Sequence, residues 1–239
     1  MRTSIIVPVY NRWEETNVCL RSLVKTKSED DEIIVIDNGS KEYLIDVVVD
    51  IYNYNEENLG FPKAVNQGVS LARGKYICIM NNDIVVTGNW LNNLIDHIEN
   101  GHADIIGPIT NESSGKQARL VKIYQNYEEL ENIAKELSEV NKARFTEVGW
   151  LIGFLFVCPK MIFEKLGGFD ERYNIGNWED IDFCYSAKQA GLHIAIAEDV
   201  YVHHFGSSSF KEDLITYKKL LRDNQKLFEE KWKGVKYEQ

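Results

Sequence analysis

Carboxylate side chains stand at three places in this chain where their chemistry could be used. Asp37 and Asp83 each follow a short apolar run, and Glu179 stands beside Asp180 in a Trp-Glu-Asp-Ile-Asp segment. A carboxylate just after a buried strand lies in the crevice where open α/β sheets bind ligands. Carboxylates can bind a nucleotide, ligate a metal ion or act as a general base. Together these groups would suit the transfer of a sugar from a nucleotide to an acceptor.

The first two groups also have purely structural interpretations. Asp37 opens an Asp-Asn-Gly-Ser segment that could bind a ribose hydroxyl or a base N–H, but that is also good Asx-turn chemistry. Asn81-Asn82-Asp83 offers oxygen ligands that suit Mg²⁺ or Mn²⁺, often held by one carboxylate and substrate phosphates. The alternative is a polar turn before a helix that begins near Trp90.

A helix start and a histidine pair could complete a diphosphate site. Gly60 and Lys63 lie where a loop opens a helix, and the N–H groups there can face an anion. The alternative is a helix start with a purely structural role. The chain has neither a Gly-x-Gly-x-x-Gly nor a P-loop motif, which disfavours dinucleotide and P-loop sites. His203 and His204 follow a strand pattern, where a histidine can ligate a metal or fill a core position. Adjacent strand residues point to opposite faces, so we expect only one of them to reach the metal.

The third carboxylate group begins a predicted helix. A carboxylate in the first turn of a helix stabilises it by about 0.3–1 kcal/mol, so capping could explain one of these acids. Capping needs only one acid, however, and the preceding Gly-Asn-Trp suggests a shaped loop. A carboxylate of this group could take a proton from an acceptor hydroxyl. Asp182 lies near the opposite face of the helix and is expected to pair structurally.

Hydrophobic patterning predicts the elements that position these groups. Strands are expected over 3–9, 32–36, 51–54, 76–80, 103–106, 153–157, 193–197 and 200–203. Helices are expected over 13–25, 62–72, 90–98, 128–140, 161–166, 180–190 and 210–232. The alternation of strands and helices in the first half predicts an α/β fold with a mostly parallel central sheet and right-handed crossovers.

Composition narrows the function further. The net charge of −10 disfavours nucleic-acid binding, and an acidic protein that binds a diphosphate needs a divalent cation. Four scattered cysteines without a Cys-x-x-Cys pair indicate neither a zinc site nor a disulfide scaffold, which fits a reducing cytoplasm. Cys78 and Cys158 lie in apolar runs and are expected to be buried. The longest apolar stretch, 148–158, is shorter than the ~20 residues that span a bilayer, and no signal peptide is predicted.

Taken in order, these motifs resemble inverting family 2 glycosyltransferases of the GT-A fold, from Thr3 to about Phe210. The subset with Gly-Gly-Phe-Asp-Glu and Trp-Glu-Asp is similar to bacterial rhamnosyltransferase-like enzymes of surface polysaccharide and glycoprotein assembly. The motifs that carry the resemblance are Ile-Ile-Val-Pro-Val-Tyr-Asn at 5–11, Asp-Asn-Gly-Ser at 37–40, Asn-Leu-Gly-Phe at 58–61, Asn-Gln-Gly at 66–68, Asn-Asn-Asp at 81–83, Gly-Gly-Phe-Asp-Glu at 167–171, Trp-Glu-Asp-Ile-Asp at 178–182 and His-His-Phe-Gly-Ser at 203–207.

The resemblance implies a role for each residue of the candidate site. Asp180 would be the general base, with Glu179 as the alternative. Asp83 and His203 would hold Mn²⁺ or Mg²⁺. The first Asp of the usual Asp-x-Asp motif is Asn81 here, and the second Asp of Asp-Asp-x-Ser is Asn38. The donor-binding residues would be Pro8, Tyr10, Asn11, Asp37, Gly60, Lys63, Asn66, Asn81, Asn82 and Asp83, and the acceptor would meet Asn177 and Trp178.

The resemblance also implies substrates and organisation. The donor would be a UDP-, dTDP- or GDP-linked sugar, and the acceptor a glycan, a lipid-linked molecule or a protein. Residues 1–107 would hold the donor and 108–209 the acceptor and base within one compact GT-A domain, with a C-terminal helix over 210–239. That helix could pack on the domain, form a homodimer or touch the inner face of the cell membrane from the cytoplasm. The alternatives are a nucleotidylyltransferase and a non-catalytic nucleotide-sugar-binding protein.

Overall fold

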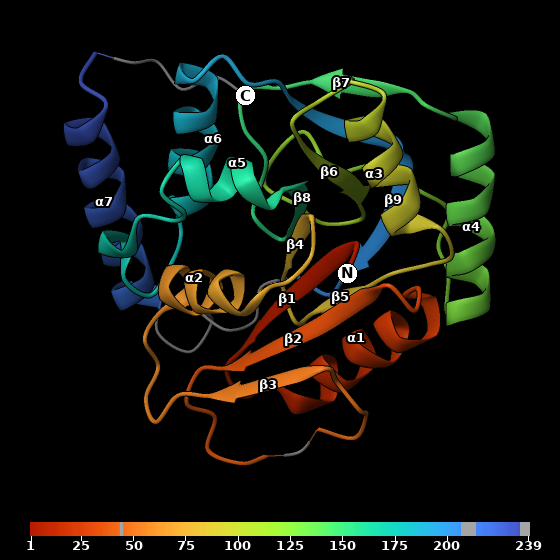
Figure 1. Cartoon of the computed structure of the whole chain (residues 1–239), viewed down its shortest axis with the longest axis horizontal. Coiled ribbons are helices and arrows are strands. Elements are labelled where there is room, and N and C mark those ends of the chain that lie inside the picture. Colours follow the sequence, from red (N-terminus) through yellow and green to blue (C-terminus); the bar gives the residue numbers. More distant parts are fainter. Residues whose placement is uncertain (44, 207–213, 235–239) are drawn as a thin grey trace.

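The computed structural model describes residues 1–43, 45–206 and 214–234. In that part of the chain, nine strands form one sheet with the order β3-β2-β1-β4-β8-β6-β9-β5, and β7 pairs with β9 (Figure 1). The strands are β1 Thr3–Val9, β2 Asp31–Asp37, β3 Ile51–Tyr54, β4 Tyr76–Met80, β5 Ile84–Val85, β6 Ile105–Thr110, β7 Phe145–Glu147, β8 Leu155–Pro159 and β9 Ile194–His204. The helices are α1 Trp13–Thr26, α2 Phe61–Leu71, α3 Trp90–Glu99, α4 Tyr127–Val140, α5 Lys160–Lys165, α6 Glu179–Gln189 and α7 Leu214–Lys231, with a 3₁₀ turn η1 at Glu171–Tyr173.

The predicted α/β fold is confirmed, and parallel pairing belongs mainly to its first half. Strands β3, β2, β1 and β4 are all parallel to their neighbours, as the alternating pattern predicted. Strand β8 is antiparallel to both β4 and β6, and β9 pairs parallel with β6 but antiparallel with β5 and β7. Because β8 runs against β4, its first residue, Leu155, pairs with the last residue of β4, Met80. The segment before β8 therefore meets the segment after β4.

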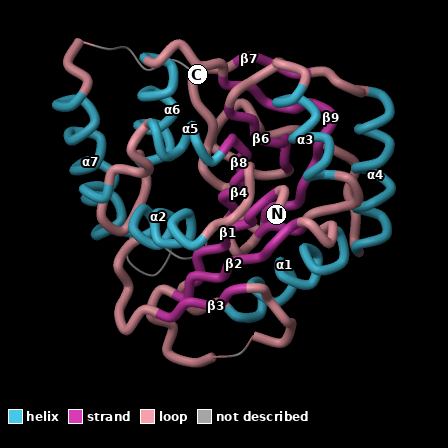
Figure 2. Tube along the Cα trace, in the orientation of Figure 1, coloured by secondary structure: helices cyan, strands magenta, loops and turns pink. Residues whose placement is uncertain are grey.

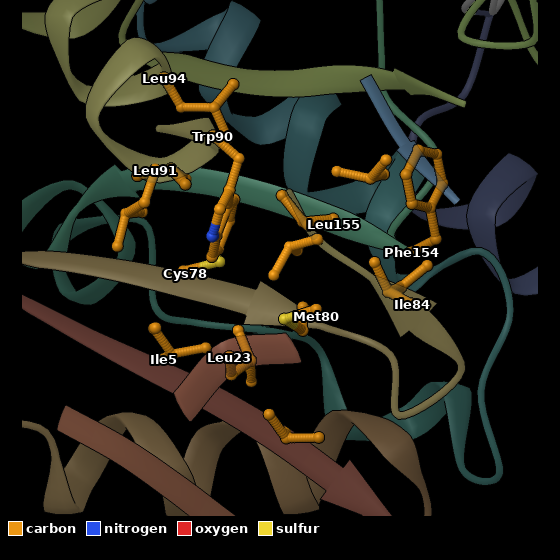
Figure 3. Packing of buried hydrophobic residues seen from close by; sticks show 14 of the residues in the cluster. Ile5, Leu23, Cys78, Met80, Ile84, Trp90, Leu91, Leu94, Phe154 and Leu155 are labelled. Carbon is orange, nitrogen blue, oxygen red and sulfur yellow. The ribbon is translucent and has the colours of Figure 1, made fainter. Parts of the chain in front are cut away.

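Alternate residues of each central strand enter two separate hydrophobic layers. Ile5 and Val7 face a cluster that includes residues of α1 and α3, whereas Ile6 faces a cluster that includes residues of α2, α4, α5 and α6. Figure 2 shows the strands running through the middle of the molecule with helices around them. In Figure 3, side chains such as Leu23 of α1 and Trp90 of α3 converge in the first cluster. Strands buried on both faces read as continuous apolar runs, which is why they could be found in the sequence.

Several element boundaries differ from the prediction. Strand β8 begins at Leu155 instead of 153, so Gly153 and Phe154 lie in the preceding loop. The two strands expected over 193–203 are one strand, β9, whose pairing with β6 shifts register after Pro108. The short strands β5 and β7 were not predicted, because two or three residues carry no periodic signal.

The C-terminal helix packs on the domain. Figure 1 shows α7 at one edge of the molecule, on the side of α6. The Phe228 ring is buried, with its centroid 5.3 Å from that of Trp178. Phe210, where this helix was expected to begin, lies outside the described residues. Among the described helices, none is long and apolar enough to cross a membrane. All four cysteines are buried free thiols, as expected for Cys78 and Cys158.

Candidate active site

The predicted base, Asp180, lies in the first turn of α6 with both carboxylate oxygens held by backbone amides. Its Oδ2 accepts a 2.7 Å hydrogen bond from the N–H of Gly153, and its Oδ1 accepts one of 2.8 Å from the N–H of Ile181. The side chain keeps some exposure to solvent. Burial among protein atoms raises the pKa of the Asp180 carboxyl, and these two hydrogen bonds oppose the rise only in part.

Glu179 is buried beside Asp180. Its Oε2 has no hydrogen-bond partner among the described residues. Burial raises the pKa of the Glu179 carboxyl well above its usual range, and the nearby charge of Asp180 raises it further. Asp182, on the same helix, instead accepts hydrogen bonds from Tyr173, Trp232 and Lys231, which is the structural pairing expected for it.

Asp83 lies beside His204 in a second part of the candidate site. Antiparallel pairing of β5 with β9 sets Ile84 opposite His204 and brings Asp83 Oδ1 within 3.3 Å of His204 Nε2. Both atoms are buried, and within the described part of the chain neither has an aligned hydrogen-bond partner. His204 Nδ1 lies 2.9 Å from the carbonyl oxygen of Glu112, to which it can donate. Nε2 is then the nitrogen turned toward Asp83.

A neighbouring side chain fixes the backbone of His204. Asn111 Oδ1 accepts from the His204 N–H at 2.8 Å, and Asn111 Nδ2 donates to the His204 carbonyl oxygen at 2.9 Å. Burial lowers the pKa of His204, but the Asp83 carboxylate and Glu112 together raise it by more, so its pKa is raised overall. A ring contact such as that of His204 Nδ1 with the Glu112 carbonyl oxygen is typical around metal-binding histidines.

His203, the expected metal ligand, faces another way. Its Nδ1 lies 2.5 Å from the hydroxyl of Tyr124, and its ring packs edge-on against Phe205. Burial lowers the pKa of His203. The structure thus places His204, and not His203, next to Asp83, because successive strand residues point to opposite faces. The resemblance named His203 as the metal ligand, and which of the two histidines would bind a metal stays a prediction.

Gly153 and Phe154 join the base to the Asp83–His204 pair. Gly153 donates to Asp180, whereas the Phe154 ring stacks on His204 with 5.2 Å between centroids and 23° between planes. The Phe154 carbonyl oxygen also accepts a 2.8 Å hydrogen bond from the Asn81 N–H. The prediction from sequence placed this dipeptide inside a core strand and gave it no role in the site. Its signal was a glycine that interrupts the apolar stretch 148–158.

Asp37, the last residue of β2, is the centre of a closed corner at the end of that strand. It is 1% exposed, with Oδ1 accepting from the Ser40 N–H at 2.9 Å and Oδ2 from the Tyr52 hydroxyl at 2.6 Å. Asn11, after β1, adopts a φ of 57° and donates its N–H to Ser40 Oγ at 2.7 Å. The Asx turn considered for this segment is therefore present. It also ties the loop after β1 to the loop after β2.

Asn38 uses both ends of its amide. Nδ2 donates to Asn58 Oδ1 and to the carbonyl oxygen of Gly60, and Oδ1 accepts from Asn55 Nδ2 and the Leu59 N–H. An aspartate could not make the two donor contacts. The change from Asp to Asn at this position thus has a structural reason: it holds the loop that precedes α2.

Five further residues were expected to bind the donor: Pro8, Tyr10, Lys63, Asn66 and Asn82. Pro8 is buried in β1, and Tyr10 is exposed beyond its end, as Lys63 is on α2. Asn82 and Asn66 point to other elements: Asn82 Nδ2 donates to Thr16 of α1. Asn66 exchanges hydrogen bonds with the Phe169 backbone and Glu171, so its amide supports the turn before η1.

The two expected acceptor residues precede the base. Trp178 packs against Phe228, and Asn177 Oδ1 accepts from the Tyr217 hydroxyl at 3.3 Å. Both therefore contact α7.

A divalent cation is compatible with the pair of Asp83 and His204. No group of three or more His, Cys, Asp or Glu residues suited to a metal is found within the described ranges. Asp83 Oδ1 and His204 Nε2, which lack an aligned hydrogen-bond partner among the described residues, nevertheless lie 3.3 Å apart. Ligands at right angles around a cation bound at ~2.1 Å are themselves about 3 Å apart. A cation that keeps substrate phosphates among its ligands needs only one or two protein ligands.

Comparison with known proteins finds glycosyltransferases among the relatives of this chain. The chain is 26% identical to the uncharacterized glycosyltransferase EpsJ of Bacillus subtilis, over 95% of this chain and 68% of that protein. Glycosyltransferase GlyG of Streptococcus pneumoniae is 29% identical over 43% of this chain, and the match spans only 37% of GlyG. The chain therefore corresponds to about a third to two thirds of these relatives.

Solved structures share the fold. The complex of S. aureus TarS 1-349 with UDP-GlcNAc superposes with a TM-score of 0.65 at 15% identity, covering 100% of this chain and 68% of that one. The structure of GalNAc-T7 with UDP, GalNAc and Mn²⁺ gives 0.66 at 16% identity, covering 96% and 56%. The model of the family "Glycosyl transferase family 2" matches residues 4–167, more than half of the chain. This chain belongs to glycosyl transferase family 2.

Proposed function

We propose that this protein transfers a sugar from a nucleoside diphosphate to an acceptor hydroxyl with inversion at the anomeric carbon. The observation that carries the proposal is the dipeptide Gly153-Phe154, which contacts Asp180 through one residue and His204 through the other. A base and a cation site held by neighbouring residues are what a direct displacement needs. Asp180 would act on the attacking hydroxyl, and a cation held by Asp83 and His204 would stabilise the leaving diphosphate.

Asp180 is the proposed general base. Its raised pKa gives it a greater affinity for the acceptor proton than an ordinary aspartate, and general-base catalysis is worth about 10²–10⁴-fold in rate. The amide hydrogen bonds from Gly153 and Ile181 fix the direction of the carboxylate. The deprotonated hydroxyl then attacks the anomeric carbon in line with the leaving diphosphate, and no covalent enzyme intermediate is required. Glu179 is the alternative base.

Asp83 and His204 would hold the cation, with His203 as the alternative ligand. When bound, the cation neutralises the charge that develops on the diphosphate. One imidazole and one carboxylate suit Mn²⁺ well, whereas Mg²⁺ prefers oxygen ligands. The net charge of −10 supports this proposal, because the protein must bring a diphosphate into an acidic molecule.

A UDP-linked sugar is the first donor to test. TarS was solved with UDP-GlcNAc and GalNAc-T7 with UDP, GalNAc and Mn²⁺, and both share this fold. We propose that residues 1–107 bind the donor near Asp37 and Tyr10, and that 108–209 carry the acceptor side near Asn177 and Trp178. Donors linked to dTDP or GDP are the alternatives.

We propose that the acceptor belongs to cell-surface polysaccharide or glycoprotein assembly. A polysaccharide-making relative supports it: the Pasteurella multocida protein named chondroitin synthase is 24% identical over 84% of this chain. That match spans only 24% of the relative. The rhamnosyltransferase-like subset and a cytoplasmic site of action stay predictions.

A thermal-shift panel followed by an activity assay tests the proposal. A ligand that binds only the native state raises the melting temperature, so UDP-, dTDP- and GDP-sugars are compared with Mn²⁺ and with a chelator. The stabilising donor is then assayed for hydrolysis by wild type and by Asp180→Asn. Stabilisation with Mn²⁺ and hydrolysis lost in the variant support the proposal. Stabilisation without any turnover by wild type would favour a non-catalytic binding protein.

A further inference from the structure

The loop before the base has an unusual backbone. Asn174, Asn177 and Trp178 have φ angles of 54°, 72° and 79°, and Gly176 has a φ of 131°. Non-glycine residues at positive φ cost of order 1–3 kcal/mol each, and they persist only where the surrounding structure holds them. Because α6 begins directly after Trp178, the shape of this loop sets the direction in which Asp180 points.

One buried amide on α7 holds this loop. Asn224 is 5% exposed, and its Nδ2 lies 3.1 Å from the carbonyl oxygen of Tyr173, 2.9 Å from that of Gly176 and 2.9 Å from that of Asn177. All three partners are acceptors, so the NH₂ end of the amide must face them. Two hydrogens are thus shared among three carbonyl oxygens. These contacts span the same stretch of backbone that adopts the positive φ angles.

A second group of contacts anchors the end of α7 on the same region. Lys231 Nζ lies 2.7 Å from Asp182 Oδ2 and 3.0 Å from Asp170 Oδ2, and Trp232 Nε1 donates to Asp182 Oδ1 at 2.7 Å. Phe228 packs between these polar contacts and Asn224 along the helix, against Trp178. One face of α7 therefore covers the loop and the first two turns of α6.

The loop also touches the proposed donor side. The Phe61 N–H at the start of α2 donates to the Ile175 carbonyl oxygen at 3.2 Å. Gly60 lies so close to the loop that a Cβ there would stand 1.8 Å from the Asn174 carbonyl oxygen. The loop thus joins the donor half, the base and α7.

We propose that Asn224 is a positioning residue for Asp180. By holding the carbonyls of residues 173–177 it keeps the loop in its strained shape, and so it keeps the carboxylate of Asp180 in the direction that meets the Gly153 N–H. The inference rests on the proposed function of Asp180, and it gives α7, which lies beyond the segment matched by the family model, a part in the reaction. Asn224 acts only through the loop and touches no substrate.

The test compares three variants of the full chain. Asn224→Ala removes both donors, Asn224→Ser keeps one, and Lys226→Ala is the control because Lys226 is exposed on the same helix. A misplacement of about 1 Å can cost about 10²-fold in rate, so we expect Asn224→Ala to lower kcat for UDP-GlcNAc hydrolysis between about 10- and 100-fold. The Kd for UDP with Mn²⁺ should stay within about twofold. Asn224→Ser should fall between Asn224→Ala and wild type, and Lys226→Ala should match wild type.

Two further readouts separate positioning from general stability. In Asn224→Ala the midpoint of the pH–rate profile should move to lower pH, because a loosened loop admits water to the carboxyl of Asp180. Amide hydrogen exchange over residues 173–182 should rise at least tenfold in Asn224→Ala but not in Lys226→Ala, and this needs no activity. The positioning role would be overturned if Asn224→Ala kept the kcat, the pH midpoint and the amide exchange of wild type. If Asn224→Ala does not fold, Asn224→Ser decides by the same readouts.

The exchange result also keeps the two proposals distinct. If wild-type protein turns over no donor, the proposed function fails, whereas local exchange in Asn224→Ala still shows whether this side chain holds the loop. If wild type is active and Asn224→Ala equals it in every readout, only the positioning role fails.

Discussion

The carboxylate of Asp180 accepts a 2.7 Å hydrogen bond from the backbone N–H of Gly153, at a position where an added side chain would crowd the aspartate. A Cβ on residue 153 would stand 3.0 Å from the Cβ of Asp180 and 3.2 Å from its Oδ2. The backbone of the segment before β8 thus passes directly over the base. This contact ties the start of α6 to the strand that pairs with β4.

Gly153→Ala should displace the base. The added methyl must push the carboxylate by a few tenths of an ångström, so we expect kcat to fall about tenfold while donor affinity stays near wild type. Steady-state kinetics with titration of UDP measure both quantities. Gly88→Ala is the matched control, because a Cβ there meets only Glu131 Oε1 at 3.4 Å. Equal losses of kcat in the two variants would show that crowding at residue 153 does not displace Asp180.

Asp180→Asn should abolish turnover and keep the fold. The amide is nearly isosteric but cannot accept the acceptor proton, so a loss of about 10²–10⁴-fold in kcat is expected, with donor binding intact. Glu179→Gln should cost less, because the side chain beside it still carries the base. Turnover lost in Glu179→Gln and kept in Asp180→Asn, with both variants binding UDP, would assign the base to Glu179.

The pH dependence follows from the raised pKa values. The rate should rise with pH through the raised pKa of Asp180, because the base must be deprotonated. The free energy of unfolding, in contrast, should fall as pH rises. A carboxyl whose pKa is higher in the folded state lowers the free energy of unfolding as pH rises from its unfolded pKa, ~4, through its folded value.

Replacing the buried acid should therefore stabilise the protein at neutral pH. We expect Glu179→Gln to raise the free energy of unfolding at pH 7 by about 1 kcal/mol and to change it little at pH 3. Urea denaturation at the two pH values measures this difference. A variant less stable than wild type at pH 7 would mean that the Glu179 carboxylate has a stabilising partner.

The cation site can be assigned by comparing the two histidines. Asp83→Ala and His204→Gln should each weaken UDP binding in the presence of Mn²⁺ about tenfold or more, and a chelator should do the same to wild type. His203→Gln should have little effect, because its ring contacts Tyr124. Isothermal titration calorimetry measures these affinities. The reverse order for the two histidines would make His203 the ligand, and equal affinity with Mn²⁺ and with chelator would remove the metal from the proposal.

Helix α7 should not bind membranes. Its inward face is occupied by packing, since Asn224 and Phe228 are buried against the domain. Co-sedimentation with vesicles containing anionic lipid should leave the full chain in the supernatant, with neutral vesicles as the control. Pelleting with anionic vesicles alone would instead support the peripheral contact and its electrostatic origin.

The sequence by itself determined the central elements and indicated the candidate reactive groups. Strands such as Ile33–Ile36 are buried on both faces, so their apolar runs were visible without a structure. The acids that follow such strands, Asp37 and Asp83, could be named because the carboxyl ends of strands face a common crevice. Local patterns such as Trp-Glu-Asp also indicated a helix start, which is where α6 begins.

Only the tertiary structure decided how these groups meet. The choice of His204 beside Asp83 depends on the register between β5 and β9, and β5 is too short to leave a pattern in the sequence. The contact of Gly153 with Asp180 and that of Asn224 with the loop join residues far apart in the chain. Such contacts depend on the packing of whole elements, whereas patterns in the sequence report only the burial and conformation of neighbouring residues.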